Sequence, residues 1–492
     1  MSAASAPDPT PITPGRIGFG GYRVDDETPE HRQALVMALD AGCSLVDTST
    51  NYTDGHSERL IGSVLGELAA RDPARRARVT VVSKIGYVQG QNLALAHERE
   101  RSGSPFPEMV RYMDGCWHCI HPEFLKDQLG RSRHRLSVQR LDVCLLHNPE
   151  YFLTDARKHG TGTDLDATRA EFYRRLQEAF ACLEERVRMG EIGAYGVSSN
   201  SAVLPPGDPE ATSVRRMLQA AVAAGGRKHH FKVLQIPMNL FESGGALQRN
   251  TGPEDGETAL EAAAATGLTV LINRPLNAFV DGRLVRVADV PLPPPGPPLE
   301  ATRASLAALL EEHQKRFAAA LPPEGAEAAE QLEQLVEQVA GLAEEIDDHQ
   351  HWEQIAQQYV IPRVNMLIGA LARSIPREHE ADWRAWWARC LPCLDDLTAE
   401  VARRAAIAGA GTPRSIAAMI DPLFPAARRQ ESLSRKALWL LCSTPGVSCV
   451  LVGMRRSEYV EDAMAVAGWD PHPDPLAVLR AVRAAPQLSK AP

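Results

Sequence analysis

Four side chains in the first third of the sequence carry the groups that proton transfer to a carbonyl oxygen requires. Tyr52 offers a phenol, but a free tyrosine has a pKa of about 10 and is a weak acid at neutral pH. A cationic lysine beside it, such as Lys84, would lower that pKa, and Asp47 could position the lysine and keep it charged. His147 could donate a hydrogen bond to the carbonyl oxygen. Together with a hydride from another source, these groups would reduce an aldehyde or a ketone.

The surrounding segments predict the elements that would bring these side chains together. Eight short apolar runs alternate with segments of helical periodicity, and runs that are apolar on both faces are typical of a parallel sheet covered by helices. Eight repeats of this kind indicate an α/β fold, a closed (β/α)8 TIM barrel. Asp47, Lys84 and His147 then follow or end three strands, at the barrel end where active sites form. The predicted strands are Arg16–Phe19, Ser44–Asp47, Val79–Ser83, Leu141–Leu146, Ala194–Val197, Lys232–Ile236, Leu268–Ile272 and Ser448–Val452.

One connection interrupts the alternation, after the seventh strand. It opens with the proline-rich run Pro291–Pro298, which is typical of a stiff linker. Further on, Leu332, Leu335 and Val339 recur at helical spacing on one face, and few strands can be found. We therefore expect an all-helical insertion, a small bundle, between strand 7 and the last helix–strand units. The predicted division is a flexible leader (1–15), the first part of the barrel (16–290), the insertion (291–429), the last part of the barrel (430–470) and a C-terminal tail (471–492).

Composition restricts the function classes. The 492 residues carry a net charge of −9, which argues against nucleic acid or a polybasic membrane contact as a partner. The apolar runs are far shorter than the roughly 20 residues that span a bilayer, and the N-terminus lacks the pattern of a signal peptide. Nine cysteines, an odd count, are scattered along the chain, mostly among apolar neighbours. A reducing compartment fits this pattern, and the cytoplasm is the predicted location.

Two Cys-x-x-Cys pairs could suggest a metal site. Cys116 and Cys119 precede His121, and a second pair, Cys390 and Cys393, falls in the predicted insertion. Four such thiolates could hold zinc, but the pairs are far apart in sequence and the second lies on a predicted helix. We expect no metal.

The first cysteine pair follows a long polar segment, Gln89–Asp114, that we interpret as an irregular loop acting as a lid. His118 or Trp117 could then line the substrate pocket.

Several segments resemble the aldo-keto reductases. ALDAGCSLVDTSTNYTDGHSERLIGSVL contains an aspartate followed five residues later by a tyrosine, VVSKIG is similar to the family's lysine segment, and LDVCLLHNPE to its histidine segment. AYGVSSNS, LQIPMNLFE and STPGVSCVLVGMRRSEYVEDAM are similar to its cofactor-binding segments. The resemblance implies a TIM-barrel NAD(P)H-dependent oxidoreductase without metal, with Tyr52 as general acid, Lys84 and Asp47 as its tuning pair and His147 as the orienting residue. It implies cofactor contacts at Gly20, Gly21, Tyr22, Asp47, Ser198, Ser199, Gln235, Asn273, Arg274, Leu276, Gly453, Arg455, Ser457 and Asp462.

The resemblance also indicates which nucleotide to expect. Arg455 and Arg456 could hold a 2′-phosphate at a helix N-terminus, which favours NADPH, with NADH as the alternative. The sequence departs from the family pattern at Asn273, where an aromatic residue commonly stacks on the nicotinamide, and at Ala463, near the adenine. The Ser-Asn pair of the family is here Ser198-Ser199. These departures concern the cofactor and leave the four catalytic positions unchanged.

The predicted function is hydride transfer between NADP(H) and a small-molecule carbonyl or alcohol substrate. The alternative is a non-catalytic nucleotide-binding barrel that acts as a regulatory or scaffold subunit, with the insertion as the docking surface for a protein partner or a second copy. A metal-dependent hydrolase on the same barrel would need histidine and aspartate ligands at the strand ends, such as a His-x-His on the first strand, and the first predicted strand contains no histidine.

Overall fold

The core of the protein is a closed barrel of eight parallel strands. In the computed structural model, which describes residues 12–160, 164–280, 283–289, 292–346 and 348–485, the strands follow the order β1-β15-β12-β9-β8-β7-β3-β2 around the barrel. All eight predicted strands are present, and the predicted (β/α)8 fold is confirmed. Apolar side chains that point into the barrel, such as Leu45, Val143 and Leu271, are fully buried. The barrel strands are β1 (Ile17–Gly20), β2 (Leu45–Asp47), β3 (Thr80–Ile85), β7 (Leu141–His147), β8 (Ile192–Ser198), β9 (Phe231–Pro237), β12 (Thr269–Asn273) and β15 (Cys449–Val452).

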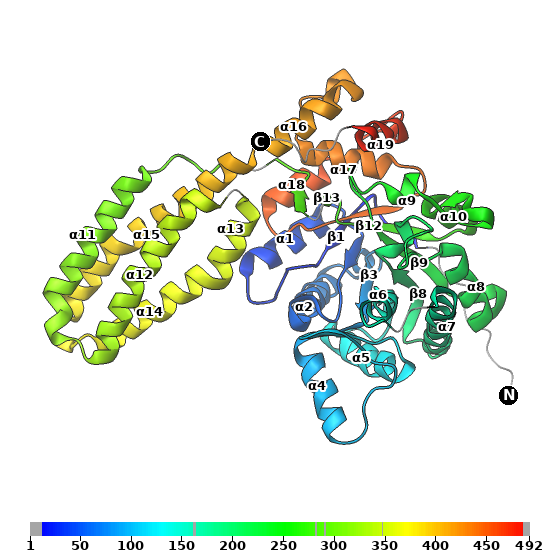
Figure 1. Cartoon of the computed structure of the whole chain (residues 1–492), viewed down its shortest axis with the longest axis horizontal. Helices are drawn as coiled ribbons and strands as arrows, with labels where there is room; N and C mark the ends of the chain where they lie inside the picture. Colours follow the sequence, from blue (N-terminus) through cyan, green and yellow to red (C-terminus); the bar gives the residue numbers. More distant parts are fainter. Residues whose placement is uncertain (1–11, 161–163, 281–282, 290–291, 347, 486–492) are drawn as a thin grey trace. The chain divides into compact units, whose positions relative to one another are not determined.

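Helices surround these strands (Figure 1). They begin where the sequence supplies start signals: α10 opens with a capping box in which Thr258 and Glu261 each bond the other's backbone amide, and α1 and α5 begin with a proline. Their apolar faces pack on the sheet, as Leu35 of α1 and Phe180 of α7 do. The helices of this part are α1 (Pro29–Asp40), α2 (His56–Arg71), α3 (Pro73–Arg76), α5 (Pro122–Arg135), α6 (Tyr151–Lys158), α7 (Leu165–Arg188), α8 (Val214–Gly225), α9 (Gly244–Leu247), α10 (Ala259–Thr266), α17 (Leu433–Ser443), α18 (Ser457–Met464) and α19 (Pro475–Ala484).

The segment between β3 and α5 is regular, which corrects the expectation of an irregular loop. It contains helix α4 (Gly90–Arg101) and a three-stranded sheet, β4 (Tyr87–Val88), β6 (Cys116–His118) and β5 (Val110–Met113). The run from Gln91 to Arg101 is rich in Leu, Ala, Glu and Arg, which are strong helix formers, so local propensity explains α4. Phe106 packs edge-on against Phe124 of α5, which attaches the segment to the barrel.

Two short hairpins and the chain ends complete this part. The hairpins are β10 (Arg249–Thr251) with β11 (Glu257–Thr258), and β13 (Asn277–Val280) with β14 (Arg283–Arg286). Of the predicted leader, residues 1–11 lie outside the described residues, whereas Ile12 accepts a hydrogen bond from Thr269 and Gly15 donates one to Ser44. Helix α19 lies within the predicted tail, and residues 486–492 lie outside the described part.

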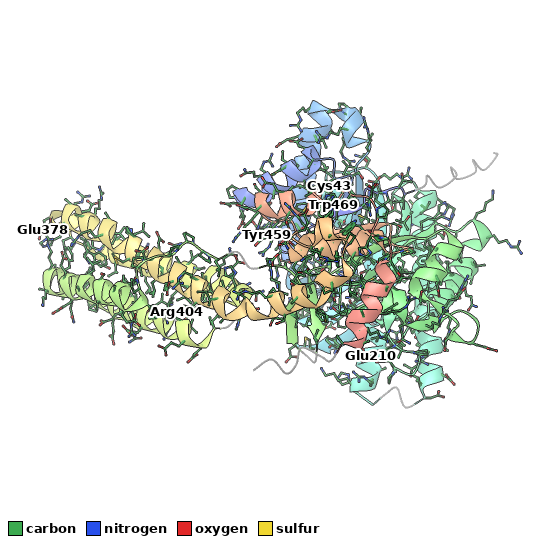
Figure 2. The ribbon with its side chains drawn as sticks, turned by 90° about the horizontal axis from the view of Figure 1, so that it is seen from above. Cys43, Glu210, Glu378, Arg404, Tyr459 and Trp469 are labelled. Atoms are coloured by element: carbon green, nitrogen blue, oxygen red, sulfur yellow. The ribbon has the colours of Figure 1, made fainter. Side chains whose placement is uncertain are left out.

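The helical insertion is present after β14 and forms a compact unit of its own. Contacts divide the described chain into one unit that runs to Val287 and resumes at Ile420, and a second unit, Ala288–Met419. In the second unit Trp352, Trp383 and Trp386 are buried in a common apolar core, as expected for a bundle. Figure 2 places Glu378 at one end of this unit, just before α15, and Arg404 farther along that helix. Its helices are α11 (Leu299–Phe317), α12 (Pro323–Glu345), α13 (His349–Ile355), α14 (Ile361–Ser374), α15 (Glu380–Gly409) and, crossing the boundary, α16 (Gly411–Ile420).

Candidate active site

Three neighbouring strands bring the predicted polar side chains together at their C-terminal ends. Asp47 is the last residue of β2, Lys84 lies near the end of β3 and His147 ends β7. Lys84 is fully buried, and its Nζ donates to Asp47 Oδ2 at 2.5 Å and to the carbonyl oxygen of Thr48 at 2.8 Å. The other carboxylate oxygen of Asp47 accepts a hydrogen bond from Gln235 Nε2 on β9 at 2.8 Å. The carboxylate is therefore fixed from both sides of the barrel.

Tyr52 completes the group from the loop after β2. Lys84 Nζ lies 4.7 Å from the centroid of the Tyr52 ring, a cation–π distance. The same ring meets the His147 imidazole edge-on with centroids 5.8 Å apart, and Tyr22 on its other side at 5.2 Å. The four residues predicted as catalytic thus form one cluster.

The turn that holds Tyr52 has an unusual backbone. Thr53, Asp54 and Gly55 have φ values of 46°, 54° and 88°, which lie in the left-handed region that β-branched residues such as threonine rarely adopt. Left-handed non-glycine residues cost free energy and persist only where the surroundings impose them. Thr53 Oγ1 donates to the carbonyl oxygen of Val24, and Asp54 Oδ1 accepts from the backbone amide of Gln91.

Helix α4, which the sequence analysis missed, supports this turn. Gln91 Nε2 donates to the carbonyl oxygen of Asp54, and Gln89 Oε1 accepts from Asn51 Nδ2 at 3.0 Å. Gly90 has a φ of 51°, and a Cβ there would lie 2.4 Å from Asp54 Oδ1, so a larger residue would displace the carboxylate that accepts from the Gln91 amide. The start of α4 therefore positions the loop of Tyr52.

The direction of the Tyr52 pKa corrects one expectation. Burial raises the pKa of Tyr52 well above its usual value, and the Asp47 carboxylate raises it further. The net direction is therefore opposite to the predicted lowering by Lys84, whose ammonium group is bound by the Asp47 carboxylate at 2.5 Å. Burial likewise lowers the pKa of Lys84 and raises that of Asp47, while the attraction between the two opposes both shifts. Tyr52 is thus fully protonated at neutral pH in the free protein.

His147 is neutral, and a serine contacts its ring. Burial lowers the pKa of His147 well below its usual value, and the charge of Lys84 lowers it further. Nδ1 of the ring lies 2.9 Å from Ser49 Oγ. When Ser49 donates this hydrogen bond, the ring proton sits on Nε2, and His147 can itself donate. Ser49 is a candidate functional residue that the sequence analysis missed, although it lies in the quoted DTSTNY segment.

His118 and Trp117 were the predicted candidates for the substrate pocket, and both have other contacts. His118 is buried, and its Nε2 lies 2.7 Å from the carbonyl oxygen of His147, to which it donates. Burial lowers the pKa of His118 to about 4, so the ring is neutral. Trp117 packs against His97 and under the guanidinium of Arg111. The hydrogen bond from His118 therefore holds the backbone of His147 in place.

Part of the predicted cofactor set forms a polar cluster next to Asp47. Gln235 Oε1 accepts hydrogen bonds from Ser198 Oγ at 3.0 Å and from Asn273 Nδ2 at 3.3 Å. Asn273 Oδ1 is buried and has no hydrogen-bond partner among the described residues. A buried acceptor without a partner costs free energy, and a carboxamide NH2 group, such as that of a nicotinamide, is the kind of donor that would satisfy it. These residues fit a nicotinamide.

The remaining predicted contacts lie at the ends of four strands, β1, β8, β12 and β15. Gly20 and Gly21 end and follow β1, where the Gly21 amide donates to the carbonyl oxygen of Asp47, and Tyr22 is 59% exposed. Ser199 follows β8, and Arg274 and Leu276 follow β12. Gly453 and Arg455 connect β15 to α18, which begins at Ser457.

Asp462, a predicted cofactor contact on α18, has its carboxylate bound to residues at the start of α17. It accepts hydrogen bonds from Ser432 and Ser434 and pairs with Arg435 at 2.9 Å.

The cysteines form no metal centre within the described part of the chain, where no group of three or more His, Cys, Asp or Glu side chains could hold an ion. Cys116 and Cys119 belong to the barrel unit, whereas Cys390 and Cys393 lie on α15 of the other unit. All nine thiols are free. Among the described helices, none combines the length and the apolar character needed to cross a bilayer.

One family model and one curated relative match part of the chain. The model of the aldo/keto reductase family matches residues 16–242. The NADH-specific methylglyoxal reductase of Escherichia coli (strain K12) is 25% identical over 146 residues, which are 28% of this chain and 39% of that protein. The chain thus spans about two-fifths of the length of this curated relative.

Several solved structures are similar to the chain at low identity. They include an aldo-keto reductase from Bacillus halodurans in its holo form (14% identity, TM-score 0.44, 98% of both chains). A glycerol dehydrogenase from Gluconobacter oxydans is also similar (16% identity, TM-score 0.44, 97% of this chain and 95% of that one). An aldo/keto reductase from Klebsiella pneumoniae in complex with NADP and acetate has 16% identity and a TM-score of 0.40, with coverage of 96% of this chain and 92% of that one.

Proposed function

Residues 16–242 belong to the aldo/keto reductase family, whose members are oxidoreductases, and from this premise we propose that the chain transfers hydride between NADP(H) and a small carbonyl or alcohol substrate. Tyr52 is the general acid in the direction of reduction. One observation carries the proposal: Asp47, Lys84, Tyr52 and His147 converge at the ends of three adjacent strands.

The raised pKa of Tyr52 suits an acid in carbonyl reduction. When bound, the nicotinamide supplies a hydride to the carbonyl carbon. Negative charge then develops on the carbonyl oxygen, and an alkoxide is a far stronger base than a phenolate, so a fully protonated Tyr52 can donate to it. Lys84 Nζ, 4.7 Å from the ring centroid, stabilises the phenolate that remains. Asp47 holds the ammonium in position through its 2.5 Å contact.

His147 orients the carbonyl oxygen. A neutral imidazole with its proton on Nε2 can donate a hydrogen bond to the oxygen without competing for the proton that Tyr52 delivers. Burial keeps the pKa of His147 low, so the ring stays neutral throughout the physiological range. This role requires that Ser49 Oγ, 2.9 Å from Nδ1, donates its one proton to the ring and not to Asn51 Oδ1, which lies 2.7 Å away.

The residues that would hold the cofactor follow from the same strand ends. Ser198, Gln235 and Asn273 would contact the nicotinamide carboxamide, which the orphaned Asn273 Oδ1 supports. Arg455 and Arg456, which precede α18, would contact the 2′-phosphate of NADPH. NADH remains the alternative, and the bacterial relative named above is NADH-specific.

The test is turnover with a generic aldehyde. Purified protein should oxidise NADPH in the presence of 4-nitrobenzaldehyde, and NADH in parallel measures the cofactor preference. Tyr52→Phe should lower kcat by at least a hundredfold, in line with the usual contribution of a positioned acid, and should keep the dissociation constant for NADPH. Unchanged turnover in Tyr52→Phe would refute the mechanism. If a nucleotide binds at micromolar concentration but is not oxidised in the presence of the aldehyde, the alternative of a non-catalytic regulatory or scaffold subunit is favoured instead.

A further inference from the structure

A cavity of about 540 Å³ lies over the C-terminal ends of β7, β8, β9 and β12. Its walls come from the loops that follow these strands and from α19, which contributes Arg483. Glu210 also lines the cavity, and Figure 2 labels this residue near α19. Both polar and aromatic side chains line the cavity. The polar side chains include Thr154, Asn200, Ser201, Ser243 and Gln248, and the aromatic ones are Tyr112, Tyr151, Phe241 and Phe279.

One carboxyl group in this cavity has a free bonding position. Glu150 is 5% exposed, and its Oε1 accepts hydrogen bonds from the backbone amides of Asn200 at 2.6 Å and Ser201 at 3.3 Å. Its Oε2 is buried and has no hydrogen-bond partner within 3.5 Å among the described residues, although the Ser199 hydroxyl lies close enough to lower the pKa of Glu150. The other acids of the cavity are satisfied, because Glu210 pairs with Arg157 and Glu242 with Arg274. Among the acids that line the cavity, Glu150 therefore has a carboxylate oxygen without a hydrogen bond, and a donor group of a ligand would supply one.

The cavity adjoins the cluster around Tyr52 through a shared strand. Glu150 follows His147 by three residues at the end of β7. The next residue, Tyr151, contacts the hydroxyl of Tyr87 at 3.1 Å, and the Tyr87 ring lies 4.6 Å from the His147 ring, centroid to centroid. The rings of Tyr87 and Tyr151 thus link His147 to the cavity, and a substrate whose carbonyl oxygen lies at His147 would extend along these rings to reach Glu150.

We infer that Glu150 is a specificity-determining residue that accepts a hydrogen bond from a hydroxyl group of the substrate, away from its carbonyl. This inference rests on the proposed function. The substrate class is a hydroxylated aldehyde or ketone, whose C–H faces would pack on the aromatic walls. Arg274 and Arg483 in the same lining disfavour an ammonium group, whereas a hydroxyl carries no charge. A hydrogen bond to a charged acceptor is worth about 1.5–3 kcal/mol, which corresponds to a preference of roughly 10- to 150-fold.

The experiment compares aldehydes that differ only in hydroxyl groups. For wild type, kcat/KM should be at least tenfold higher for erythrose than for butanal and for glyceraldehyde than for propanal, each corrected for the free aldehyde fraction. Glu150→Gln keeps an oxygen for the amides of Asn200 and Ser201 and should remove most of this preference, while kcat/KM for butanal changes less than threefold. The matched control is Glu184→Gln, since Glu184 is another buried carboxylate that accepts from a backbone amide, that of His230, at the opposite end of the strands. This control should keep the preference.

A second measurement needs no variant. Burial raises the pKa of Glu150 to about 7, and the ionised carboxylate is the stronger acceptor. The KM for erythrose should therefore fall as pH rises from 6 to 8, while the KM for butanal stays constant. Absence of a hydroxyl preference in wild type, or equal losses for both substrates in Glu150→Gln, would overturn the inference. Failure to reduce 4-nitrobenzaldehyde would instead refute the proposed function itself.

Discussion

Replacing Lys84 by methionine should destabilise the barrel by removing one half of a buried ion pair. The side chain of Lys84 is fully buried and that of Asp47 is 5% exposed, so methionine fills the space but leaves the carboxylate with Gln235 as its remaining side-chain donor. Breaking a buried pair in this way costs about 3–5 kcal/mol. Amides that exchange through opening of the barrel should then exchange roughly two to four orders of magnitude faster.

The cost should also depend on pH. Burial already raises the pKa of Asp47 in the folded state, and without the lysine it rises further above its value in the unfolded chain, so folding favours the protonated acid. The variant should therefore approach wild-type stability below about pH 4, where the unfolded chain is also protonated, and lose stability as pH rises through the folded-state pKa. Neutralising the acid as well, in Lys84→Met/Asp47→Asn, should restore most of the loss at pH 7.

Hydrogen–deuterium exchange with mass spectrometry can measure this effect in the barrel alone. Peptides from β3 and β7 report the barrel unit, and peptides from α12 in the same sample correct for the intrinsic effect of pH on exchange. A change of less than tenfold in the β3 peptides at pH 7 would refute the idea that the pair is energetically important. If the double variant is as unstable as Lys84→Met, lost packing and not an uncompensated charge is the cause.

Two further variants test the supports of the cluster. Ser49→Ala removes the partner of His147 Nδ1 at 2.9 Å and should lower kcat/KM about tenfold, the value of one hydrogen bond, with unchanged NADPH binding; a loss of less than twofold in steady-state kinetics would show that Ser49 does not select the tautomer. Gly90→Ala places a Cβ 2.4 Å from Asp54 Oδ1 and should lower kcat/KM by displacing the turn of Tyr52. The matched control is Gly103→Ala, which has a φ of 75° and no neighbour within 4 Å, so it carries the backbone penalty alone; equal activity in the two variants would contradict the role of α4.

The barrel could be predicted because its strands are short apolar runs with few alternatives. Runs such as Leu141–Leu146 are buried on both faces, and their order along the chain fixes which strand ends carry Asp47, Lys84 and His147. The insertion could be recognised from the spacing of its leucines and from its tryptophans, three of which lie in the bundle core.

Other features depend on three-dimensional surroundings that a linear pattern does not contain. Helix α4 was taken for a loop because the segment is polar, although its residues favour a helix. The direction of the Tyr52 pKa depends on how deeply the ring is buried and on the nearby Asp47 carboxylate, and neither can be seen in the spacing of residues along the chain. Glu150 attracted no attention in the sequence, because its significance lies in an oxygen left unpaired where four loops and α19 meet.

The order of strands around the barrel has a consequence for biosynthesis. Strand β15 closes the barrel between β1 and β12, as the pairs Ile17 with Val450 and Leu271 with Cys449 show, but it is translated after the whole helical unit. Until the ribosome has passed Val452, β1 and β12 are unpaired edges of an open apolar sheet, which are prone to associate with other chains. The nascent chain must therefore remain protected while the bundle is synthesised, and chaperone dependence should be greater than for a barrel without the insertion.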